Sequence, residues 1–169
     1  MRLLLPFYLL LTPFAAFAGS DLLDKPAPAF DLPRLTEGRV TSAELRGKPV
    51  VLVIGTTQEA APLCREWMVT LEERFRGSDK KVFQVAVLDN PWYLPKFAVK
   101  KKLRTFVPEH GYPLVLIEWK TAFGEAYGIE RDDIPRVVVI DRKGIVRAWY
   151  VGAMNPSTLG DVLSDVAAL

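Results

Sequence analysis

The chain has 169 residues, of which 50% are hydrophobic and 25% are charged, and its formal net charge at pH 7 is +2. This composition fits one globular domain whose core needs neither disulfides nor a structural metal. The nearly neutral charge gives no electrostatic reason to expect a nucleic-acid partner or a strong attraction to an anionic membrane.

Residues 1–18 have the layout of a signal peptide. Arg2 supplies a positive start, residues 3–14 are apolar, and residues 16–18 (AFA) match the small-x-small pattern of a cleavage site. The apolar stretch is shorter than the about 20 residues that a membrane-spanning helix needs. We therefore expect cleavage after Ala18 and a mature domain over residues 19–169, in the periplasm or secreted. The alternative is an uncleaved segment that anchors the same domain to the membrane, facing the periplasm.

The mature sequence opens with an extended entry segment over residues 19–33, where prolines disfavour helix. The continuous apolar run at 50–54 predicts a strand buried on both faces. Trp67, Leu71 and Phe75 recur every four residues and predict an amphipathic helix. Continued along the chain, such patterns predict strands at 49–55, 82–88, 114–117, 137–140 and 145–151, and helices at 62–75, 93–107, 120–127 and 156–168.

Strands that alternate with helices and end in a hairpin and a helix predict an α/β fold. Its central mixed β-sheet would be flanked by helices on both faces. The turn of this hairpin falls at residues 141–144 (DRKG), which contain the glycine that tight turns favour.

The chain has one cysteine, Cys64, so it cannot form an internal disulfide. In an oxidising compartment a lone thiol is either buried and inert, or exposed and used. The only histidine, His110, lies in a separate turn, and no cluster with metal-ligand spacing is present. No phosphate-binding loop or dinucleotide fingerprint is present either, and we expect neither a cofactor nor a metal.

Several stretches, taken in order, resemble the thioredoxin-like superfamily. The matching residues are 29–32 (AFDL), 45–52 (LRGKPVVL), 111–116 (GYPLVL) and 134–144 (IPRVVVIDRKG). The order and spacing are most similar to the exported TlpA/ResA-like thiol-disulfide oxidoreductases of the redoxin (AhpC/TSA) type. The resemblance implies a thioredoxin-like fold over essentially all of the mature chain.

The resemblance fails at the active site. The family places a Cys-x-x-Cys pair at the start of the helix that follows the central strand, and here the residues are Ala61-Pro62-Leu63-Cys64. Ala61 therefore replaces the attacking cysteine, and Cys64 matches the resolving one, which is usually shielded. A shielded thiol in apolar surroundings is a poor nucleophile. A peroxiredoxin needs threonine three residues before its reactive cysteine, and that position is again Ala61.

The resemblance also implies a groove for an extended partner chain. In the family a cis peptide precedes the residue that matches Pro135, and the backbone before it faces the active-site helix. Ala61, Pro62, Ile134 and Pro135 are therefore the candidate groove residues. The alternative is that Pro135 only shapes the entry of its strand.

Three functions follow as hypotheses. The first is an exported, non-dithiol binding protein that holds a protein partner of the cell envelope, in redox or protein-maturation pathways, and is not an enzyme. The second is a redox protein that works through Cys64 alone, by mixed disulfide or sulfenic acid. The third is a structural module that binds a membrane complex through the basic helix at 96–104. Lys96, Lys100 and Arg104 share one face of that helix, which we interpret first as a solvated face.

Overall fold

A five-stranded mixed sheet forms the centre of the molecule in this computed structural model, which describes residues 20–88 and 93–169. The strand order is β5-β4-β3-β6-β7. The first three strands in this order run parallel, whereas β6 is antiparallel to β3 and β7 is antiparallel to β6. The bounds are β3 (Val50–Gly55), β4 (Lys81–Val87), β5 (Val115–Glu118), β6 (Arg136–Ile140) and β7 (Val146–Val151).

The central position of β3 follows from its sequence. All six of its residues are buried, as expected for a strand with neighbours on both sides and layers on both faces. Val53 is paired with Gln84 of β4 on one side and with Val137 of β6 on the other. The C-terminal end of β3 leads directly into the loop before the first α-helix.

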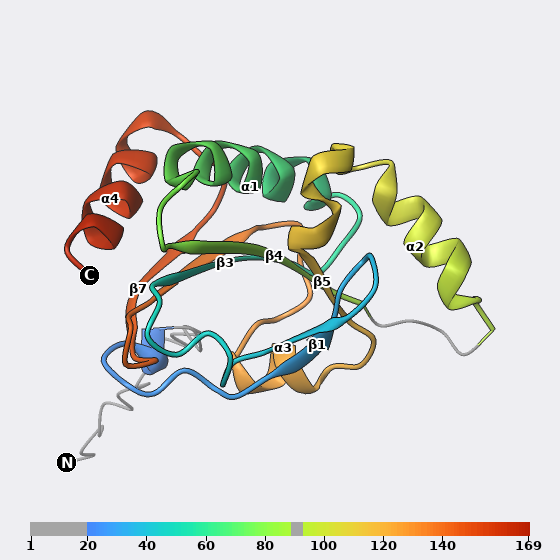
Figure 1. The fold of residues 1–169 in the computed structure, drawn as a ribbon. Helices are drawn as coiled ribbons and strands as arrows, with labels where there is room; N and C mark the ends of the chain where they lie inside the picture. The colour runs from blue at the N-terminus through green and yellow to red at the C-terminus, as the bar shows by residue number, and fades with distance from the viewer. Residues whose placement is uncertain (1–19, 89–92) are drawn as a thin grey trace, which may run out of the picture.

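Helices cover both faces of the sheet, as predicted (Figure 1). The helices α1 (Ala61–Phe75) and α4 (Pro156–Ala167) pack on one face, where Trp67 and Leu71 belong to the buried cluster. The other face is covered by the short helix α3 (Ala122–Ala126) and by a small hairpin, β1 (Asp31–Pro33) with β2 (Arg39–Thr41).

The basic helix α2 (Lys96–Arg104) differs from the others, because none of its residues is buried. It extends away from the sheet at the right of Figure 1. It is shorter than the predicted 93–107 helix and begins after Pro95, which has extended backbone angles. Proline disfavours helix in the residue before it, and this accounts for the later start.

The entry segment was predicted to be extended, but it begins with the 3-10 helix η1 (Ser20–Leu22) before it reaches β1. The predicted signal peptide, residues 1–18, lies outside the described residues. Among the helices of residues 20–88 and 93–169, none is both long and apolar enough to cross a bilayer.

Candidate functional site

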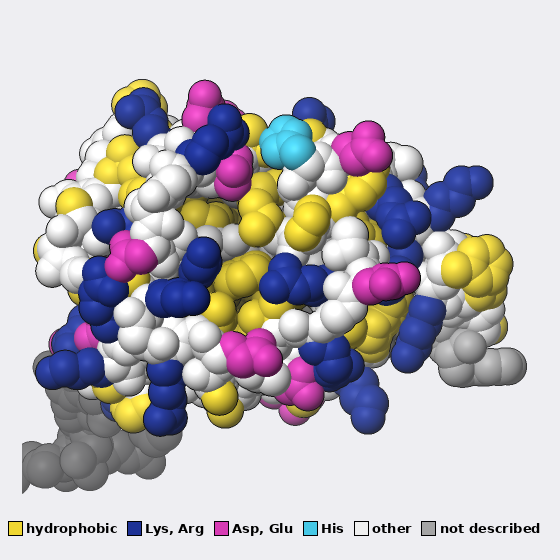
Figure 2. All heavy atoms as spheres, viewed as in Figure 1, with side chains coloured by type: hydrophobic (Ala, Val, Ile, Leu, Met, Phe, Trp, Pro, Cys, Tyr) yellow, Lys and Arg dark blue, Asp and Glu magenta, His cyan; other side chains and the backbone are white. Residues whose placement is uncertain are grey.

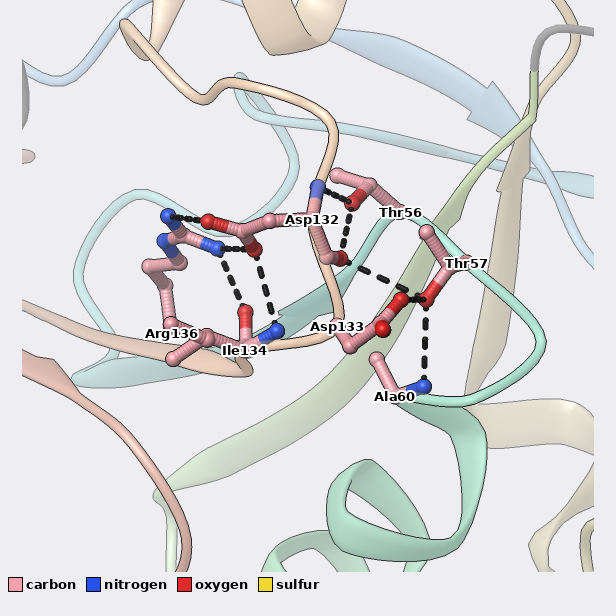
Figure 3. Close-up of polar contacts among 7 residues, drawn as sticks. All are labelled: Thr56, Thr57, Ala60, Asp132, Asp133, Ile134 and Arg136. Carbon is pink, nitrogen blue, oxygen red and sulfur yellow. Dashed lines mark hydrogen bonds and ion pairs between the residues drawn. The ribbon is translucent and has the colours of Figure 1, made fainter.

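Two loops meet at one end of the sheet and define the candidate site. One loop joins β3 to α1, and the other precedes β6 (Figure 3). Thr56 Oγ1 donates a hydrogen bond to the carbonyl of Asp132 at 2.7 Å and accepts one from the amide of Asp132 at 2.9 Å. This reciprocal pair fixes the two loops together, and we call it, with the contacts of Thr57 below, the loop clasp.

Thr57 extends the loop clasp to the start of α1. Its hydroxyl donates to Asp133 Oδ1 at 2.8 Å and accepts from the amide of Ala60 at 3.1 Å. The N-cap residue of α1 is Ala60, whose side chain makes no capping hydrogen bond. The clasp therefore satisfies one backbone amide just before the helix and sets where α1 begins.

Arg136 holds the second loop from the start of β6. Its Nη2 donates to Asp132 Oδ2 at 2.6 Å, and its Nη1 contacts Asp132 Oδ1 and the carbonyl of Ile134. The hydrogen bond from Arg136 lowers the pKa of Asp132; partial burial opposes this shift, and the Ile134 amide assists it. Asp132 is therefore ionised at neutral pH, and its charge is paired.

The four predicted groove residues lie at this end of the sheet but differ in exposure. Ala61 and Pro135 are buried, whereas Pro62 and Ile134 are exposed, Ile134 by 43%. The expected cis peptide is wrong, because every peptide bond among the described residues is trans, Ile134–Pro135 included. Trans is the lower-energy isomer of an X-Pro bond, and here the hydrogen bond from the Ile134 amide to Asp132 Oδ1 holds the loop.

Cys64 lies on the first turn of α1 and is buried. Its side chain has no exposed surface and belongs to the buried cluster between α1 and the sheet. A Cβ on Gly55 would lie only 2.7 Å from Cys64 Sγ, so the glycine provides the space for the sulfur. Burial raises the pKa of the Cys64 thiol to about 12, although the charge of Arg136 lowers it in part. At neutral pH the group is a neutral thiol, which is a poor nucleophile.

A pocket of about 570 Å³ opens beside this site, between the sheet and α2. Its walls include Ala61, Ala86 and Leu103, and Cys64 also lines it, although no surface of Cys64 is exposed to solvent. Gln84 also lines it and was missed by the sequence analysis. The signal was present, since Gln84 is the one polar side chain within the run predicted as a buried strand at 82–88.

The basic face predicted on α2 is not simply solvated. Lys100 Nζ donates to the carbonyls of Arg34 and Thr36 at 3.3 and 3.4 Å. Lys96 Nζ lies 5.3 Å from the centre of the Trp119 ring. This face is therefore turned toward the body of the protein, and Arg104 likewise lies over the Tyr112 ring.

No group of three or more His, Cys, Asp or Glu side chains is arranged to hold a metal ion in the described part of the chain. His110 lies on the 3-10 helix η2 (Glu109–Leu114), apart from Cys64 on α1. The site as built offers an apolar pocket, a rigid loop clasp and exposed apolar side chains. Its one thiol, Cys64, is not an activated nucleophile, because burial raises its pKa.

Comparison with known proteins gives a consistent family. A family model described as Redoxin matches residues 22–165. A thiol peroxidase of Mycobacterium bovis is 29% identical over 142 residues, covering 84% of this chain and 78% of the relative.

Two solved structures share the fold. A DsbE-type thiol:disulfide interchange protein from Chlorobium tepidum has a TM-score of 0.64 and 24% identity, covering 86% of this chain and 97% of that one. The exposed lipoprotein thioredoxin Etrx1 of Streptococcus pneumoniae has a TM-score of 0.64 and 17% identity, covering 82% and 99%. At these identities the likeness concerns the fold.

Proposed function

Since the chain belongs to the redoxin family, we propose that it is a non-dithiol member that binds a protein partner in the cell envelope. The observation that carries the proposal is the state of Cys64. The position of the family's attacking cysteine is Ala61, and the remaining thiol is buried with its pKa raised to about 12. Dithiol exchange needs an accessible thiolate and a second thiol to resolve the mixed disulfide. This leaves binding as the role that the site supports best.

The binding surface in this proposal is the clasped end of the sheet. Pro62 and Ile134 are exposed there on two loops that hydrogen bonds hold in place. A rigid surface loses little conformational entropy when a partner docks. An extended partner segment could lie across these two side chains and contact both loops.

Export is part of the proposal. It is supported by the signal-peptide layout of residues 1–18, with cleavage after Ala18. Structural relatives include an interchange protein and an exposed lipoprotein thioredoxin, which fits a place in the envelope. The partner would belong to redox or protein-maturation pathways of that compartment.

A photo-cross-linking experiment tests the proposed surface. A photoreactive phenylalanine analogue is placed at Ile134 in cells of the source organism, and adducts to envelope proteins are identified. The matched control is Leu23, which is exposed by 41% against 43% for Ile134. Leu23 lies near the start of β7, whereas Ile134 is near its end. We expect a discrete adduct from position 134 and none from position 23.

Two variants separate this function from the alternatives. Cys64→Ser should leave the adduct in place, because the thiol takes no part in binding. Lys101→Glu should also leave it, because Lys101 lies on α2 and not on the clasped end. No adduct at position 134, or adducts that vanish with Cys64→Ser, would contradict the proposal.

The second candidate is a redox role through Cys64, and the likeness to a thiol peroxidase favours it. That role requires a thiolate that a peroxide or a disulfide can reach. The third candidate, binding through α2, is favoured by Phe97, which is 75% exposed on that helix. It predicts that Lys101→Glu abolishes partner capture and that Cys64→Ser does not.

A further inference from the structure

The pocket between β4 and α2 is mostly apolar. Side chains from both elements and from the residues before α2 form its walls, and Ala86, Leu94 and Val99 are among them. Its volume of about 570 Å³ lies in the range of about 300–1,000 Å³ that small-molecule sites occupy. The pocket exists because α2 stands off the sheet and buries none of its own residues.

Gln84 makes this pocket unusual. It lies on β4 with only 4% of its surface exposed, and it lines the pocket from the sheet side. Among the described residues, no donor is within hydrogen-bond reach of its Oε1. A buried polar atom without a partner is unfavourable, and most such atoms in proteins are satisfied. The unused acceptor therefore indicates a donor that is supplied from outside residues 20–88 and 93–169.

The exposed rim of the pocket is basic. Lys102 and Arg131 both line it and both are exposed. Lys102 Nζ lies over the ring of Phe106, 5.3 Å from its centre, so its charge is held at the edge of the apolar wall. Figure 2 shows basic side chains gathered over α2 at the right of the molecule, beside hydrophobic ones.

We propose that this pocket binds a small amphipathic anion. The ligand would have an apolar body for the walls, an N–H or O–H group that donates to Gln84 Oε1, and a negative group that faces Lys102 and Arg131. The proposal goes beyond partner binding at Pro62 and Ile134, and it involves no chemistry at Cys64. We infer a small molecule and not a protein segment, because the unsatisfied acceptor of Gln84 lies on the sheet at the inner side of the pocket.

Three related fluorescent probes test the proposal on the purified protein. The first is 2,6-anilinonaphthalene sulfonate, which has an apolar body, a free N–H and a sulfonate. The second is its N-methyl derivative, which lacks the donor, and the third is N-phenyl-2-naphthylamine, which lacks the charge. We expect saturable binding of the first probe, about fivefold tighter than the second, as one neutral hydrogen bond would give. We expect it to bind about threefold tighter than the third, as one exposed charge pair would give.

Variants assign each advantage to a residue. Gln84→Leu should remove the preference for the N–H probe over its N-methyl derivative and leave the preference for charge. Lys102→Glu should remove the preference for charge and leave the preference for the donor. Lys101→Glu is the matched control, because Lys101 is exposed on the same helix but does not line the pocket. It should change neither preference.

If Gln84→Leu does not fold, Ala98→Trp still tests whether the probes bind in this pocket. Ala98 lines the pocket from the partly exposed face of α2, so a large side chain there should fill the space and weaken all three probes at least tenfold. Native circular dichroism of each variant confirms folding. No saturable binding to the folded wild type, or equal binding to Ala98→Trp, would overturn the proposal. So would donor and charge preferences that survive both substitutions.

Discussion

The contact between Gly55 and Cys64 shows how one residue sets the role of another. Gly55 ends β3, and the sulfur of Cys64 occupies the space where a larger residue would place its Cβ. In this position Cys64 acts as a small apolar core residue. Buried cysteines of this kind are inert unless a nearby charge and access to solvent activate them.

We predict that Gly55→Ala lowers the free energy of unfolding by about 1–3 kcal/mol, the usual cost of overpacking a core. In a Cys64→Ala background the same substitution should cost less, because the sulfur that it would meet is gone. Urea unfolding of the four proteins gives this coupling as a double-mutant cycle. An equal cost in both backgrounds would show that Gly55 does not serve to accommodate the sulfur.

Gln84 is a polar residue in an otherwise apolar stretch of β4. Val82, Phe83 and Val85 beside it are buried apolar residues that explain the strand by themselves. A buried glutamine among apolar neighbours lowers the stability of the ligand-free fold unless a hydrogen-bond donor satisfies its side-chain oxygen. The proposed ligand of the pocket would supply that donor, whereas packing of the sheet does not explain a glutamine at this position.

At the scale of elements, the loop clasp connects β3, α1 and β6. Thr56 and Thr57 meet Asp132 and Asp133 across 75 or more positions of sequence, and Arg136 binds Asp132 from the first residue of β6. The clasp therefore joins the loop before α1 to the loop before β6. We expect its strength to depend on the charge of Asp132.

The sign of this pH dependence follows from the lowered pKa of Asp132. A carboxyl whose folded pKa lies below its unfolded value stabilises the fold fully above about pH 4, the unfolded value. The contribution is lost as the pH falls through the folded pKa. We predict that Asp132→Asn lowers stability at pH 7 and makes the loss of stability between pH 5 and pH 2 shallower.

Urea midpoints measured across this pH range check the prediction. The matched control is Glu37→Gln, since Glu37 is exposed in the turn between β1 and β2 and lies outside the clasp. The control should keep the acid dependence of the wild type. An Asp132→Asn protein with the same acid slope as the wild type would contradict the role assigned to this carboxylate.

The elements that the sequence predicted well are those with strong local signals. The run at 50–54 and the spacing of Trp67 and Leu71 predict β3 and α1 because burial repeats along a few neighbouring residues. The β1–β2 hairpin was not predicted, since each strand has only three residues. The clasp could not be predicted either, because its partners are distant in sequence and become neighbours only when β3 pairs with β6.

For the candidate site, the sequence indicated which residues to consider but not how they are arranged. The absence of a second cysteine and the position of Ala61 could be read from the sequence and a resemblance. The cis peptide was transferred from the family and is wrong here. The pocket could not be foreseen, because it depends on how far α2 stands from the sheet, and no local pattern encodes that separation.

At the scale of the whole molecule, the sheet separates two buried clusters. Trp67 and Cys64 belong to the one beneath α1 and α4, whereas Phe123 and Tyr127 belong to the other. Trp67 Nε1 also donates to the carbonyl of Gly152 at 3.1 Å, which ties α1 to the end of β7. Cys64 has no exposed surface but lines the pocket beside α2, so a reagent reaches its sulfur only when the residues of that pocket wall move.

Cys64 is a buried core residue, and we propose that this redoxin acts by binding a partner. Alkylation of Cys64 in the purified protein, followed against pH with and without denaturant, distinguishes a buried thiol from a reactive one. We predict that Cys64 of the native protein is labelled slowly, at a rate limited by local opening of the structure around it. The labelling rate should show no rise near pH 8.5 in the native protein and should become fast on unfolding. Rapid labelling of the native protein, with an apparent pKa below about 8.5, would mean that Cys64 is an activated thiol and would favour the redox role over binding.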